Sequence, residues 1–85
     1  MTTLQQAQQD INTLSKKPSN ENLLFLYAHY KQATTGDCLG KRPSMLEVTG
    51  RMKFDAWAKL KGISKTEAEA QYIAKVQALL AADAK

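Results

Sequence analysis

Residues 20–36 read NENLLFLYAHYKQATTG, and this stretch indicates the fold class. Ser19 or Asn20 can cap the start of a helix, and Glu21 favours the positive end of the helix dipole. The segment is apolar on nearly every side up to Ala28, which is typical of a helix with more than one covered face. Gly36 is a natural stop. The pattern therefore predicts a helix over about residues 20–35.

Upstream of this segment, a narrower apolar stripe predicts a helix over about residues 3–15. Apolar side chains recur there at 3-4-3 spacing, at Leu4, Ala7, Ile11 and Leu14. Thr2 or Thr3 can cap this helix. Pro18 is expected to end it, because proline disfavours helix in the residue before it.

Downstream, residues 36–47 are expected to form a loop, because Gly36, Gly40 and Pro43 interrupt any helix. A connection of about a dozen residues is longer than most, and such loops are often functional.

Two more helices are predicted, over about residues 50–61 and 64–82. Ser64 and Glu67 form a capping box at the start of the last helix. Apolar stripes follow at Ala56, Trp57 and Leu60, with Trp57 expected in the core, and at Ala68, Tyr72, Val76, Leu79 and Leu80. Four amphipathic helices in one short chain must pack together. We therefore expect residues 1–85 to form a single all-α domain, a four-helix bundle.

The charge of the chain is concentrated in its middle. The net charge is +4, but residues 41–65 alone carry seven basic and two acidic side chains, a net of +5. This distribution predicts an anionic partner, which can be nucleic acid, phospholipid head groups or a phosphorylated small molecule. The single cysteine, Cys38, cannot form an internal disulfide. No apolar run is long enough to span a membrane, and no signal peptide is visible, so we expect a cytoplasmic protein.

The sequence contains no pattern typical of catalysis. Paired carboxylates, a nucleophile–histidine–carboxylate set, a glycine-rich phosphate loop and a CxxC motif are all absent from it. His29 has no second ligand at metal spacing, and Cys38 has no histidine beside it. We therefore expect a binding protein with no cofactor. Polar groups on inward-leaning helix positions suggest a ligand that meets them there: Tyr27, Tyr30, Lys31, Lys53 and Tyr72.

Residues 24–37 resemble the Tyr-x-x-Tyr-Lys-Gln-Ala-Thr-x-Gly-Asp signature of the acyl-CoA-binding protein family. The resemblance covers essentially the whole chain and continues at residues 42–43, 53–57, 61–65 and 70–76. It implies a four-helix bundle with up-down-down-up topology. It also implies reversible binding, shielding and intracellular transport or pool-keeping of medium- to long-chain fatty acyl-CoA esters.

The resemblance also implies roles for individual residues. Lys31 and Lys53 would hold the 3′-phosphate of CoA from two different helices, and Lys17 would reach the pyrophosphate. The nucleotide and thioester region would be lined by Tyr27, Tyr30 and Tyr72. Lysine suits phosphate as a compact point charge, and an aromatic face can stack on adenine.

Leu24 and Ala28, with Ala56, would contact the acyl chain or the pantetheine arm. Asn12 belongs to the same implied site, but it stands where the family often has a lysine. Thr49 also replaces a common lysine, although Arg51 nearby can supply part of the charge. We expect the missing cation at Asn12 to weaken one phosphate contact and so to lower the affinity.

Two other classes of protein compete with this interpretation. A small basic helical module could bind nucleic acid, but it would need its cations along one recognition helix. A membrane-surface helix would need a strongly basic amphipathic segment. Here the cations are spread over loops and two helices, which favours a pocket. We therefore expect a monomer that binds fatty acyl-CoA, without a specific nucleic-acid partner or a membrane span.

Overall fold

The computed structural model describes residues 3–83, which contain four α-helices, one short 3-10 helix and no strand. The elements are α1 (Leu4–Asp10), η1 (Ile11–Thr13), α2 (Asn20–Thr34), α3 (Val48–Ala58) and α4 (Lys65–Asp83). The predicted all-α class is confirmed.

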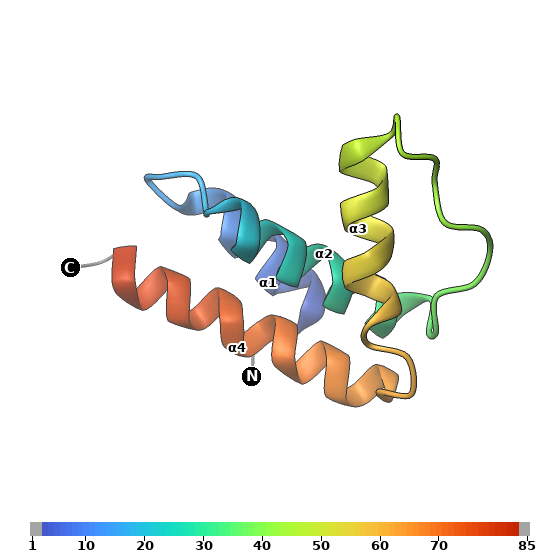
Figure 1. Cartoon of the computed structure of the whole chain (residues 1–85). Helices are drawn as coiled ribbons and strands as arrows, with labels where there is room; N and C mark the ends of the chain where they lie inside the picture. Colours follow the sequence, from blue (N-terminus) through green and yellow to red (C-terminus); the bar gives the residue numbers. More distant parts are fainter. Residues whose placement is uncertain (1–2, 84–85) are drawn as a thin grey trace.

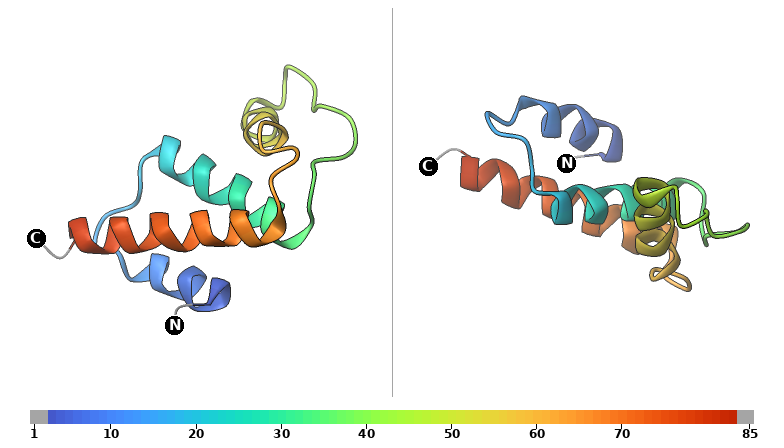
Figure 2. Two further views of the ribbon diagram at one scale, coloured as in Figure 1. Left: turned by 90° about the horizontal axis from the view of Figure 1, so that it is seen from below. Right: turned by 45° about the horizontal axis from the view of Figure 1, so that its top comes forward.

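The longest helix, α4, lies between α1 and α2 (Figure 2). In Figure 1, α1 and α4 run in one direction and α2 runs in the opposite one, whereas α3 crosses steeply near the end of α2. Within the described residues, α3 packs against α2 and against no other helix. The molecule thus has a three-helix body, formed by α1, α2 and α4, with α3 attached to one side.

The core lies where the three helices of this body meet. Its fully buried apolar members are Ala7, Leu26, Tyr72 and Val76. Around them pack Leu4, Ile11, Tyr30, Ile73, Leu79 and Leu80. The apolar face predicted for the last helix is confirmed. That of the first helix is confirmed at Leu4, Ala7 and Ile11, whereas Leu14 is extended and lies outside the core cluster. By contrast, α3 contributes no buried side chain.

Three of the four predicted helix starts, those of α1, α2 and α4, are confirmed by their caps. The hydroxyl of Thr3 accepts a hydrogen bond from the Gln6 amide at 3.1 Å, and that of Ser19 accepts one from Asn22 at 3.1 Å. The Ser64 hydroxyl accepts one from the amide of Glu67 at 3.0 Å. Thr2, the alternative cap for α1, lies outside the described residues. These side chains satisfy backbone donors that the first turn of a helix leaves unpaired.

The predicted C-terminal end of the first helix is wrong. α1 ends at Asp10, the chain tightens into η1, and Leu14 is extended. The Thr13 hydroxyl donates to the Asp10 carbonyl at 2.7 Å, and the Asn12 side chain donates to the Gln8 carbonyl at 3.3 Å. Such local side-chain bonds compete with a regular helix, so the helix stops well before Pro18.

The predicted bounds of the third helix are also shifted. α3 begins at Val48 and ends at Ala58, whereas residues 50–61 were expected. Beyond Ala58 the chain continues in tight turns, in which the Leu60 amide donates to the Trp57 carbonyl at 2.9 Å. Gly62 then takes a positive φ of 94°, a conformation that residues with a Cβ rarely adopt.

A buried glutamine joins the two connections on either side of α3. The Nε2 of Gln32, a side chain only 1% exposed, donates to Asp37 Oδ1 at 2.8 Å and to the Ile63 carbonyl at 2.7 Å. Asp37 Oδ1 also accepts from the Gly62 amide at 2.9 Å. The bonds from Gly62 and Gln32 hold the pKa of Asp37 below its ordinary value. This network fixes both ends of the segment that carries α3.

Candidate functional site

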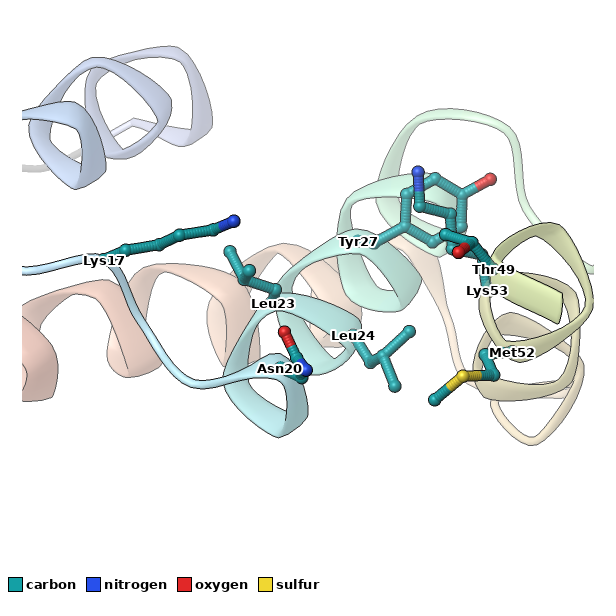
Figure 3. A pocket seen from close by; sticks show the side chains of 8 residues that line it. All are labelled: Lys17, Asn20, Leu23, Leu24, Tyr27, Thr49, Met52 and Lys53. Atoms are coloured by element: carbon teal, nitrogen blue, oxygen red, sulfur yellow. The ribbon is translucent and has the colours of Figure 1, made fainter.

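A groove of about 290 Å³ lies between α2 and α3. The residues that line it are Lys17, Asn20, Leu23, Leu24, Tyr27, Thr49, Met52 and Lys53. In Figure 3, Lys17 extends from the connection before α2 and Lys53 lies on α3, whereas Leu23, Leu24 and Tyr27 come from α2. The groove therefore combines an apolar wall with cations that come from different elements.

A second hollow, of about 420 Å³, adjoins the groove and shares Lys17 and Leu23 with it. Its other lining residues are Ile11, Asn12, Leu14, Lys16 and Pro18. The two hollows bring five of the predicted site residues to one surface: Asn12, Lys17, Leu24, Tyr27 and Lys53. Ligand sites of drug-sized molecules have volumes of about 300–1,000 Å³, so these hollows are of a suitable size.

Two lysines cross the interface between α2 and α3, and each lies over an aromatic ring of the other helix. Lys53 Nζ is 5.3 Å from the ring centroid of Tyr27, and Lys31 Nζ is 5.1 Å from that of Trp57. Tyr27 and Lys31 are one turn apart on α2, and Lys53 and Trp57 are one turn apart on α3. The two pairs therefore follow each other in the same order along α2 and along α3, although the helices cross steeply.

Neither of these lysines forms an ion pair within residues 3–83. The one ion pair there joins Arg42 to Asp55 at 2.6 Å, and it holds the pKa of Asp55 below its ordinary value. Lys31 and Lys53 therefore place two positive charges at the interface of α2 and α3, each over a neutral ring. An anion that enters between α2 and α3 would meet both charges.

Four predicted site residues line neither hollow. Tyr72 is 5% exposed, with its ring 6.0 Å from that of Tyr30, and burial followed by the effect of Tyr30 raises its pKa. Ala28 is buried as well, and Tyr30 packs against the core. Lys31 lies over Trp57, as described above. The ligand contacts implied for these four residues therefore stay predictions.

Trp57 was expected in the core, but it is only half-buried and lies outside the core cluster. Its Nε1 donates to the Gly36 carbonyl at 2.9 Å. This bond joins α3 to the end of α2, where Gly36 has a positive φ of 96°. Trp57 thus attaches α3 and supports the Lys31 ammonium group.

The sequence interpretation missed several residues of the groove. Asn20, Leu23 and Met52 line it and were not expected there, and Thr49 was noticed only as a replaced lysine. Helical spacing could have identified two of them. Asn20 lies four residues before Leu24, and Leu23 lies four residues before Tyr27, so each shares a helix face with a predicted site residue. Lys16, in the second hollow, directly precedes Lys17 and gave no separate signal.

Other chemistry in the described part of the chain is sparse. No group of three or more His, Cys, Asp or Glu side chains there could hold a metal ion. His29 stacks on Phe25 at a centroid distance of 4.0 Å, and its Nδ1 lies 2.8 Å from the Phe25 carbonyl. Because a carbonyl only accepts, Nδ1 carries the proton of this bond. None of the helices over residues 3–83 has the length and hydrophobicity to cross a membrane.

Comparisons with known proteins agree with this geometry. The family profile described as "Acyl CoA binding protein" matches residues 2–76. The acyl-CoA-binding protein of Dictyostelium discoideum is 47% identical over 74 residues, which are 87% of this chain and 88% of that protein. The protein of the same name from Saccharomyces cerevisiae is 48% identical over 71 residues, or 84% of this chain and 82% of that one.

Solved structures give the same result. The crystal structure of Oryza sativa acyl-CoA-binding protein 2 superimposes with a TM-score of 0.91 at 40% identity, and it covers 96% of this chain and 89% of that one. The solution structure of the yeast acyl-coenzyme A binding protein gives a TM-score of 0.72 at 42% identity, over 95% and 94% of the two chains. With the profile match over most of its length, the chain belongs to the acyl-CoA-binding protein family.

Proposed function

We propose that the groove between α2 and α3 binds a medium- to long-chain fatty acyl-CoA reversibly. Binding of acyl-CoA, with its transport or storage as a pool, is the function of this family, whose members are binding proteins and not enzymes. The observation that carries the proposed site is the pair of lysines, Lys31 and Lys53, that cross between α2 and α3 without a carboxylate partner.

In the proposed complex, the two lysines hold the 3′-phosphate of CoA. Each leaves a neutral ring, Trp57 or Tyr27, for a charged oxygen, which is a stronger partner than an aromatic face. Tyr27 then offers its ring to the adenine. Tyr72 belongs to the core and Tyr30 packs against it. In the proposed complex these two residues would support the nucleotide-binding surface from the protein interior.

Lys17 lies between the two hollows and would bind the pyrophosphate. Asn12, in the second hollow, would supply a neutral hydrogen bond where a lysine would supply a charge. Leu24, with Leu23 and Met52, offers an apolar wall to the acyl chain or the pantetheine arm. Ala28 is too deeply buried for more than a contact through its methyl group. Each buried methylene of the chain contributes about 0.8 kcal/mol before entropy losses.

We further propose that the protein acts in the cytoplasm as a monomer, without a cofactor and without a specific nucleic-acid partner. Its cations are spread over loops and several helices, and two of them, Lys17 and Lys53, line the groove. A major-groove reader would instead require its cations along one exposed helix face.

The test is a calorimetric titration of the protein with palmitoyl-CoA, free CoA and free palmitate. We expect one palmitoyl-CoA per protein, with both free CoA and palmitate much weaker. Each of them lacks one half of the interactions, either the apolar chain or the phosphates. Equal affinities for palmitate and palmitoyl-CoA would refute the proposed site.

A further inference from the structure

All the large apolar side chains that are strongly exposed in the described structure lie in one short segment, residues 39–52. Leu46, Leu39 and Met45 are 93%, 84% and 78% exposed, and Val48 and Met52 are exposed to a smaller degree. The first three belong to the connection between α2 and α3, which stands away from the three-helix body in Figures 1 and 2. Exposed apolar side chains gathered in one place mark an interaction surface more often than chance.

The same segment is positively charged. It holds Lys41, Arg42 and Arg51 against one acidic residue, Glu47. Arg42 is paired with Asp55, whereas Lys41 and Arg51 form no ion pair within residues 3–83. The segment thus contains exposed apolar side chains together with two basic groups that form no ion pair within residues 3–83.

We propose that residues 39–52 dock onto the surface of an anionic phospholipid bilayer. Leu39, Met45 and Leu46 would enter the layer between head groups and acyl chains, and Lys41 and Arg51 would face the head groups. Interfacial binding of this kind combines buried apolar area with attraction between basic residues and anionic lipid. Binding to a bilayer does not require shape complementarity, so side chains on an exposed loop can take part in it.

A protein partner fits the segment less well. Residues 39–52 contain no aromatic residue, whereas Trp and Tyr are enriched among the residues that dominate protein–protein affinity. Arginine is enriched there as well, but of the two arginines in this segment Arg42 is already paired with Asp55. A second copy of the chain would need to bury about 800 Å² on each side, which three loop side chains do not provide.

Docking at a bilayer would bring the proposed acyl-CoA site to a source of its ligand, so this role of the segment rests on the proposed function. Thr49 and Met52 belong both to this segment and to the wall of the groove. A docked segment would therefore place the α3 side of the groove at the lipid surface. An acyl-CoA dissolved in that surface through its chain could pass into the groove without crossing bulk water.

The experiment is flotation of the full chain with phosphatidylcholine vesicles that either contain or lack phosphatidylserine. We expect binding only to the vesicles with phosphatidylserine. The double variant Met45→Ser/Leu46→Ser, which keeps the charge, should lose about tenfold or more of the vesicle partition coefficient. Lys41→Gln should lose about fivefold, and the matched control Lys61→Gln, outside the segment, less than about twofold.

Three outcomes would overturn the proposal: no flotation with either kind of vesicle, equal losses for Lys41→Gln and Lys61→Gln, or a dimer on size exclusion that Met45→Ser/Leu46→Ser abolishes. Palmitoyl-CoA affinity in solution, measured on the same variants, separates docking from the proposed function. Unchanged affinity of the double variant with lost flotation supports docking. A parallel loss of affinity would mean that the segment contacts the ligand and not the bilayer.

Discussion

The body formed by α1, α2 and α4 and the attached helix α3 are held in different ways. The body buries apolar side chains from each of its helices around Leu26 and Val76. α3 buries none and is attached by one indole hydrogen bond, two lysine–ring contacts and the Gln32 network at its ends. The comparison teaches that stability and binding are divided between the two regions. The groove lies where packing is incomplete, and its cations form no ion pair with a carboxylate within residues 3–83.

The largest effect is expected in the body. Leu26→Ala should lower the free energy of unfolding by about 2–5 kcal/mol, because it removes a buried side chain and leaves a cavity. Urea unfolding would measure the change. Met52→Ala, at an exposed side chain of α3 that lines the groove, is the matched control and should change stability by less than about 0.5 kcal/mol. Similar losses for the two variants would contradict the division between body and attached helix.

Binding should respond in the other region. Lys53→Gln should weaken palmitoyl-CoA binding by about 1.5–3 kcal/mol, which is roughly ten- to a hundredfold, because a charge-assisted contact to phosphate is lost. Stability in urea should stay nearly constant. The control is Lys59→Gln, an exposed lysine of the turn after α3 that lines neither hollow. If Lys53→Gln destabilises the protein but leaves the affinity for palmitoyl-CoA unchanged, Lys53 has a structural role and does not bind the phosphate.

The same division explains what the sequence could predict. The face of α4 was predictable at Ala68, Tyr72 and Val76, because a buried stripe imposes its period on the sequence. The end of α1 could not be predicted from the sequence. The apolar spacing continues at Ile11, which lies in the 3-10 turn, and at Leu14, which is extended. Spacing alone does not distinguish these backbones.

The site was predictable to a smaller degree, and mainly through the family resemblance. Lys17, Leu24, Tyr27 and Lys53 line one groove, while their contacts with a ligand stay a prediction. Tyr72 satisfies the family pattern equally well, yet it is buried in the core, because one aromatic side chain can serve either purpose. The side chains of α3 are only partly buried against α2 and form no regular apolar stripe. Their positions in the sequence therefore show no period from which the groove could be predicted.

A smaller effect should sharpen the picture of how α3 is attached. Trp57→Phe removes the hydrogen bond to the Gly36 carbonyl but keeps a ring under Lys31. It should lower stability by about 0.5–1.5 kcal/mol, the usual net value of one such bond. Hydrogen exchange should accelerate in α3 and stay unchanged in α4. Faster exchange in both helices would mean that α3 and the body open as one unit.

The smallest effect at neutral pH is expected at Asp37. Its pKa is lowered by the bonds from Gly62 and Gln32, so the stability that it contributes is complete above the unfolded-state value of about 3.9. That stability is lost as the pH falls through the lower folded-state value. Asp37→Asn should therefore lower stability slightly at pH 7, have less effect below the folded-state pKa, and flatten the acid side of the stability curve. Thermal melts from neutral to acid pH would measure this change. If stability falls with pH as steeply in the variant as in the original protein, the Asp37 carboxylate does not stabilise the fold through these bonds.

The position of Trp57 has a spectroscopic consequence. It is the one tryptophan of the chain, and the Lys31 ammonium group lies over its ring. If Lys31 turns to a phosphate, the charge above the indole is neutralised or moves away. The intrinsic fluorescence of the protein should then change in wavelength or intensity as acyl-CoA binds. The molecule would thus report its own occupancy without an added label.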